Sequence, residues 1–186
     1  MHALPWRQTV RRRKEAVVAD RVSDFLAQWE RERPDLDVSP MGVIGRLSRV
    51  SEITGRALSR TFTAHGLTSG EFDTLATLRR AGSPFTLTPG ELAASSMVTG
   101  AAMTNRLQRL EDKGLLVRAT DPENRRRVHV RLTDDGRARV DEVVVEHMRT
   151  EQDLLDAHLT RTQQGELAAL LATFLESSGD VSMRRD

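Results

Sequence analysis

Apolar side chains recur at helical spacing near the start of the chain. One face of a helix over about 15–33 is formed by Val18, Val22, Phe25, Leu26 and Trp29, at i, i+4, i+7, i+8 and i+11. Pro34 would end this helix because proline cannot continue the hydrogen-bond ladder. A second helix is predicted over 39–65, with Ser39 as its N-cap, Pro40 at its first position and Gly66 after its end.

Three further helix starts carry recognisable caps. Residues 68–71 and 88–91 are capping boxes, in which a threonine oxygen accepts from a free amide and a glutamate returns to the amide of the threonine. Thr99 is placed to cap a third helix, and Gly114 is placed to end it. Its apolar stripe consists of Met103, Leu107 and Leu110. The pattern therefore predicts a helix followed by a helix-turn-helix.

After Gly114 the apolar period changes from helical to alternating. Residues 115–118 and 128–132 have the pattern of two short strands, and the polar segment 121–126 joins them. A hairpin directly after a helix-turn-helix makes a winged helix. We therefore predict a mainly α-helical fold with a small β-hairpin wing.

Two more helices follow the wing. Thr133 and the two aspartates after it favour the start of a long helix to about 158, because acids in the first turn suit the helix dipole. Thr160 with Gln163 is another capping-box match, for a last helix over 162–177. The apolar stripe of that helix is Leu167, Leu170, Leu171, Phe174 and Leu175.

Charge is uneven along a chain whose net charge is only +1. Residues 1–14 carry five basic side chains and no acid, and residues 99–131 carry eight basic side chains against four acids. A local basic patch on a near-neutral chain favours a polyanionic partner. The alternative is that these arginines form a solvated surface.

Composition excludes several other classes of protein. The sequence has no cysteine, which excludes disulfides, thiolate metal sites and thiol redox sensing. No apolar run approaches the roughly 20 residues of a spanning helix, and a secretory signal is missing, so we expect a cytoplasmic protein without a membrane partner. An enzyme is disfavoured because a phosphate loop and a nucleophile elbow are both missing. His147 and His158 would lie about 16 Å apart on one helix, too far to share a metal. No cofactor is expected.

The predicted helix after Thr99 would be the recognition helix. Ala101 and Asn105 lie nearly opposite its apolar stripe, where alanine suits a thymine methyl and the asparagine amide suits adenine. Arg109 would reach guanine or phosphate, and Arg125 or Arg126 at the wing tip would enter the minor groove. The predicted DNA contacts are Thr99, Ala101, Thr104, Asn105, Arg109, Arg125 and Arg126.

Five segments in this order resemble the MarR family of bacterial regulators over about 40–176. They are residues 91–93, 103–107, 110–116, 121–126 and 132–136. One departure is Asn124, where the wing of the family usually has an acid before two arginines. This puts in doubt the salt bridge that usually braces the wing.

The resemblance implies a homodimer with a helical dimerisation region below two winged domains. The implied division is a basic arm and extra helix (1–38), a dimerisation helix (39–67), the winged helix-turn-helix (68–133), C-terminal dimerisation helices (134–178) and a tail (179–186). Such a dimer would bind double-stranded DNA at half-sites about one helical turn apart, and hence a pseudo-palindrome.

The N-terminal helix resembles that of the urate-responsive branch of the family. The resemblance implies an effector pocket for a small anion such as urate, formed by Trp29, Asp73, Arg106 and Arg118. Other interpretations stay open: Trp29 as a core residue, Asp73 in a structural ion pair with either arginine, and Arg106 as a phosphate contact. The predicted function is a ligand-responsive repressor. The alternative is a protein-interaction module that keeps the fold without binding DNA.

Overall fold

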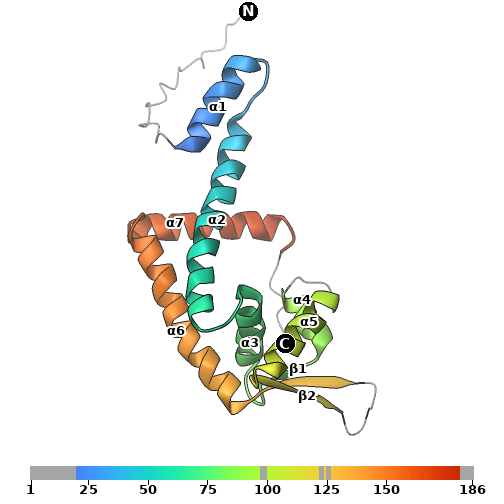
Figure 1. Ribbon diagram of the computed structural model, residues 1–186. Coiled ribbons are helices and arrows are strands. Elements are labelled where there is room, and N and C mark those ends of the chain that lie inside the picture. The colour runs from blue at the N-terminus through green and yellow to red at the C-terminus, as the bar shows by residue number, and fades with distance from the viewer. Residues whose placement is uncertain (1–19, 97–99, 122–123, 125–126, 181–186) are drawn as a thin grey trace, which may run out of the picture. The chain divides into compact units, whose positions relative to one another are not determined.

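The computed structural model describes residues 20–96, 100–121, 124 and 127–180 (Figure 1). The chain divides into two compact units, 1–52 and 53–186, and each is described by itself. Across the described ranges, every helix is too short or too polar to span a membrane.

The first unit contains α1 (Arg21–Glu32) and the first half of α2 (Ser39–Ala64). Helix α1 begins at Arg21 and not near 15, because the Asp20 carboxylate caps it by accepting from the Ser23 amide at 2.8 Å. It ends at Glu32, two residues before Pro34, as predicted. Ser39 is already helical rather than a preceding cap, and the Asp37 carboxylate accepts from its amide at 2.9 Å.

Asp20 also joins α1 to α2. Its carboxylate accepts from Nε of Arg46 at 2.9 Å. The Ser23 amide is the largest influence on this carboxyl, and together with Arg46 it outweighs desolvation and lowers the pKa of Asp20 to about 2. Gly45 lets the helices approach closely, since a Cβ there would lie 3.2 Å from Cγ1 of Val22.

The second unit begins with the second half of α2, followed by three short helices: α3 (Ser69–Arg80), α4 (Pro89–Ser96) and α5 (Gly100–Asp112). Both predicted capping boxes are confirmed, at Thr68 with Glu71 and at Thr88 with Glu91. Gly114 ends α5 with a φ of +70°, and the next amide donates to the carbonyl of Leu110 at 3.0 Å. This is the predicted left-handed C-terminal residue.

Three antiparallel strands form the sheet, in the order β1-β3-β2: β1 (Thr86–Leu87), β2 (Leu116–Thr120) and β3 (Val128–Leu132). The predicted hairpin is present, but its first strand occupies 116–120 and not 115–118. Strand β1 is not predicted from the sequence, because a two-residue strand has no period of its own. It forms only because Thr86 pairs with Arg131, far along the chain.

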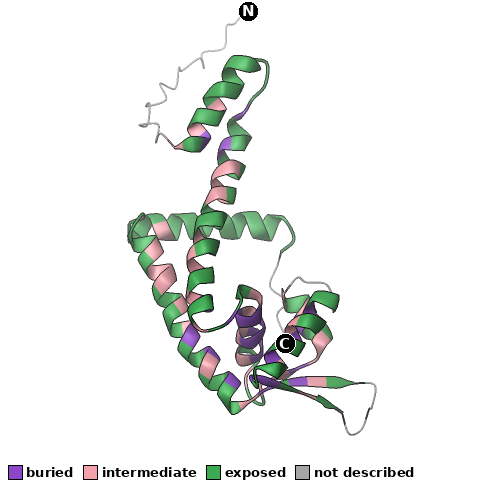
Figure 2. Ribbon diagram, in the orientation of Figure 1, coloured by how far each residue is buried: buried purple, intermediate pink, exposed green. Residues whose placement is uncertain are grey.

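Two long helices complete the unit: α6 (Asp134–Asp156), capped by Thr133, and α7 (Arg161–Ser177), with the predicted capping box at Thr160. The core gathers where α3, α5, the sheet and the start of α6 meet, and Leu75, Leu110, Val130 and Val143 are fully buried there. Figure 2 shows the contrast with α7, whose described residues include no buried side chain.

Candidate DNA interface and effector pocket

Helix α5 has one buried face and one exposed face, as the sequence predicts. Met103, Leu107 and Leu110 are buried in the core. On the other face Ala101, Thr104 and Asn105 are exposed. Thr99, the predicted cap and DNA contact, lies outside the described residues. The exposed face therefore presents small and polar groups on a helix that its leucines hold in place.

A buried carboxylate anchors α5 to α3. Glu71 is 1% exposed, and it accepts from Nζ of Lys113 at 2.9 Å and from Nε of Arg109 at 3.3 Å. Burial alone would raise the pKa of Glu71, but hydrogen bonds from the Thr68 amide and Lys113 hold it below its usual value. The sequence identified Glu71 only as a cap residue. Arg109, predicted to contact DNA, has an intramolecular partner at its Nε.

An acid at the start of the turn, Asp121, braces the wing. The Asp121 carboxylate accepts from the Asn124 amide at 3.2 Å and lies 3.1 Å from Nε2 of His129. The Asp121 amide also donates to the carbonyl of Arg127 at 2.9 Å. The hairpin is thus closed without an acid at position 124. Arg125 and Arg126 lie outside the described residues.

Arg118 ties the first wing strand to the recognition helix. Its Nε donates to Glu111 at 2.8 Å, its backbone amide donates to the same carboxylate at 3.1 Å, and Nη2 donates to Gln108. The hydrogen bonds from Arg118 lower the pKa of the Glu111 carboxyl. Of the predicted effector residues, Arg118 is therefore directed toward α5 and not toward Asp73.

Arg106 and Asp73 are brought together. Nη1 of Arg106 lies 3.8 Å from the Asp73 carboxylate and 3.4 Å from Oγ1 of Thr74. The Arg106 side chain is only 14% exposed, whereas Asp73 is 45% exposed. Arg106 thus turns inward from α5, as its position beside the apolar stripe predicts, and faces a carboxylate that solvent can reach.

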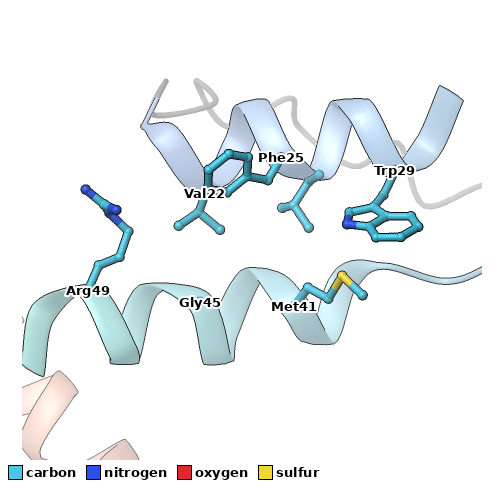
Figure 3. Close-up of a pocket in the computed structure, with 7 residues that line it drawn as sticks. Val22, Phe25, Trp29, Met41, Gly45 and Arg49 are labelled. Atoms are coloured by element: carbon cyan, nitrogen blue, oxygen red, sulfur yellow. The ribbon is translucent and has the colours of Figure 1, made fainter. Parts of the chain in front are cut away.

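Trp29 belongs to the other unit, where it is 45% exposed and not a buried core residue. It lines an apolar hollow of about 280 Å³ between α1 and α2. Figure 3 shows Phe25 and Trp29 on α1 facing Met41 and Arg49 on α2. Among the described residues, no cluster of His, Asp and Glu is arranged to hold a metal ion.

Comparison with known proteins identifies the family. Residues 65–127, which include the helix-turn-helix and the first wing strand, match the sequence model of the MarR family. The chain is 45% identical over 150 residues to the HTH-type transcriptional regulator PecS of Dickeya dadantii, an alignment covering 81% of this chain and 90% of that protein.

Solved structures of similar fold include regulators bound to DNA or controlled by a ligand. A mutant of MarR from E. coli complexed with operator DNA has a TM-score of 0.63 and 28% identity, covering 79% of this chain and 97% of that one. Bordetella bronchiseptica BpsR, whose DNA binding is regulated by 6-hydroxynicotinic acid, has a TM-score of 0.62 and 26% identity, covering 71% and 91%. The match to the family model and the identity to PecS over most of its length establish that this chain is a member of the MarR family of transcriptional regulators.

Proposed function

We propose that this protein is a repressor that binds a pseudo-palindromic operator as a homodimer and is released by a small anion. The observation that carries the DNA-binding part is the two-faced α5 helix. Ala101, Thr104 and Asn105 are exposed, while the opposite stripe is buried and Glu71 anchors the helix. A rigid helix with short side chains on its free face suits the major groove.

The proposed dimer is supported by apolar faces that the chain itself leaves uncovered. Leu170, Phe174 and Leu175 on α7 are 70%, 59% and 47% exposed, and Met148 on α6 is 53% exposed. Exposed apolar side chains that recur along one helix face, as on α7, favour a protein partner. A second copy is the occupant we propose, because a two-fold dimer also explains how two recognition helices would engage two half-sites.

The proposed effector is a small planar anion such as urate, acting at Arg106 and Asp73. An anion between them would repel the Asp73 carboxylate and attract the Arg106 guanidinium, so that Arg106 draws α5 away from its DNA-reading position. The anion can release DNA only if it binds the conformation that cannot bind DNA more tightly than it binds the conformation that can. To weaken operator binding 100-fold, the anion must favour the incompetent state by about 2.7 kcal/mol, which a few charge-assisted contacts supply.

The operator can be found by selecting genomic fragments with the purified protein. We expect the bound fragments to share a pseudo-palindrome with half-sites about 10 base pairs apart. Fragments without a shared motif, or none retained at physiological salt, would instead favour the alternative that this chain is a protein-interaction module.

Asn105→Ala is expected to weaken operator binding by about 1 to 3 kcal/mol and to relax the preference at one base pair, because the amide matches the edge of adenine. Titration of operator and scrambled duplexes at one fixed salt concentration measures this. The scrambled duplex serves as the control. An equal loss of affinity on both duplexes would contradict base readout by Asn105.

Asp73→Asn is expected to keep operator affinity within about twofold while abolishing release by the anion, because it removes the repelled charge and leaves the core intact. The assay is release of labelled operator by urate and by 6-hydroxynicotinic acid. Arg118→Ala is the contrasting variant: it should weaken operator binding without any anion, because Arg118 joins the wing to α5. If Asp73→Asn leaves release unchanged, the effector does not act at this pair.

A further inference from the structure

The guanidinium of Arg106 lies directly against the backbone of Gly70 on α3. A Cβ added to Gly70 would lie 2.5 Å from Nη2, 2.7 Å from Cζ and 2.9 Å from Nε of Arg106. These distances are all shorter than a tolerable contact. In this place the guanidinium is compatible only with glycine at residue 70, and because it is the end of a flexible side chain, a Cβ there would displace the guanidinium and not the backbone.

Directed interactions alone do not hold the guanidinium in this place. Its Nη1 atom is 3.8 Å from Asp73 and 3.4 Å from Oγ1 of Thr74, and both distances are long for a strong hydrogen bond. The side chain is nevertheless only 14% exposed. Shape, provided by the bare backbone at Gly70, thus contributes to its placement together with charge.

Gly90 occupies the same place in α4 as Gly70 does in α3, and it shows that a side chain can fit at this helix position. Gly70 is the second residue of α3, after the Thr68 cap, just as Gly90 is the second residue of α4 after Thr88. A Cβ on Gly90 would meet only Oγ1 of Thr88, at 4.0 Å. Neither glycine has a positive φ. Backbone conformation therefore does not require glycine at position 70, and the contact with Arg106 is the constraint that the structure shows there.

We propose that Gly70 is a positioning residue that seats Arg106 and thereby sets how α5 lies against α3. A side chain at position 70 expels the guanidinium from the seat and disturbs the recognition helix. Operator affinity then falls without any change to a DNA-facing residue. The inference also deepens the effector mechanism, and that part rests on the proposed function, since Gly70 defines the place that Arg106 leaves when an anion attracts it.

The test is a double-mutant cycle between positions 70 and 106, read by thermal unfolding and by operator titration. In the otherwise unchanged protein, Gly70→Ala should weaken operator binding about tenfold, and displacement of the guanidinium should offset the gain in melting temperature that alanine gives within a helix. Gly90→Ala, the control for stability, should leave the melting temperature unchanged or raise it. In an Arg106→Ala background, Gly70→Ala should raise the melting temperature, because alanine is favoured over glycine in a helix once the guanidinium is gone.

A difference in the effect of Gly70→Ala between the two backgrounds, on melting temperature and on operator affinity, is the decisive result. An equal effect of Gly70→Ala in both backgrounds would overturn the proposal. If the Gly70→Ala protein does not fold, Arg106→Ala should restore folding when it is added. Restored folding supports the proposal that Gly70 positions Arg106, and a double variant that still does not fold overturns it. None of these measurements uses an anion. If positions 70 and 106 are coupled but urate does not release the protein from DNA, the proposed urate mechanism is refuted. The proposed role of Gly70 is then still supported.

Discussion

Gly136→Ala is expected to destabilise the folded subunit by about 3 kcal/mol or more. Gly136 lies in the first turn of α6, where a Cβ would be 1.8 Å from the carbonyl oxygen and 2.8 Å from the carbonyl carbon of Leu115. The colliding atoms belong to the backbone, so a rotamer change cannot relieve the overlap. Either α6 or the junction of α5 and β2 has to move.

The junction resists such a movement because it is tied at several points. The Thr133 amide donates to the carbonyl of Leu115 at 3.2 Å, and its hydroxyl donates to the carbonyl of Gly114 at 2.8 Å. The same hydroxyl accepts from the Gly136 amide at 2.9 Å. Separation of the two segments breaks the two hydrogen bonds from Thr133 to the carbonyls of Leu115 and Gly114, at about 1 kcal/mol each, and exposes the buried Leu115 and Leu116.

Urea unfolding of the purified protein measures the loss. Gly165→Ala is the matched control, since Gly165 lies inside α7 and a Cβ there meets nothing within 4 Å. That substitution should raise the free energy of unfolding by about 0.5 to 1 kcal/mol. A Gly136→Ala protein as stable as the unchanged chain would show that the junction adapts and that our account of this glycine is wrong.

The double substitution Leu171→Glu with Leu175→Glu is expected to convert the protein to a monomer and to weaken operator binding more than about 100-fold. Both side chains lie on the apolar face of α7, where they are 37% and 47% exposed in the single chain. The subunit therefore tolerates charge there. Burying these carboxylates at an interface with a second copy would cost several kcal/mol per ion, in both subunits.

Sedimentation of the unliganded protein and titration of a full operator test this expectation. The control is Ala169→Glu with Thr173→Glu, which has the same charge and spacing but is turned about 160° away on α7. It should sediment as a dimer and bind DNA as before. A Leu171→Glu/Leu175→Glu protein that remains dimeric would place the dimer interface elsewhere, and an operator-binding monomer would refute the proposed architecture.

The boundaries of several elements could be predicted because their signals lie within one helical turn. The capping boxes at Thr68 and Thr88 and the glycines after α2 and α5 satisfy backbone groups three to five residues away. The apolar stripe of α5 is also a local pattern, and Met103, Leu107 and Leu110 are buried as it predicts. Local chemistry of this kind determines helix type and helix face before any tertiary contact forms.

The apolar period predicted the wrong start for the first helix, because a capping side chain nearby determines where that helix begins. Val18 continues the apolar period of the first helix, yet the carboxylate of Asp20 caps that helix and α1 begins at Arg21. The cap prevails because its side chain satisfies the Ser23 amide, whereas the period alone satisfies no backbone group.

The sequence by itself determined the winged helix-turn-helix order, the caps and the face of α5 that is free. Only the tertiary structure decided which groups the charged residues contact and at which glycine positions a Cβ would collide with a neighbouring group. Arg109 meets Glu71 across 38 residues, Arg106 lies on Gly70, and Gly136 touches Leu115. Strand β1 likewise exists only through its pairing with β3. Such contacts join residues that are distant in sequence, and no periodicity or spacing specifies which distant groups the packed core brings together.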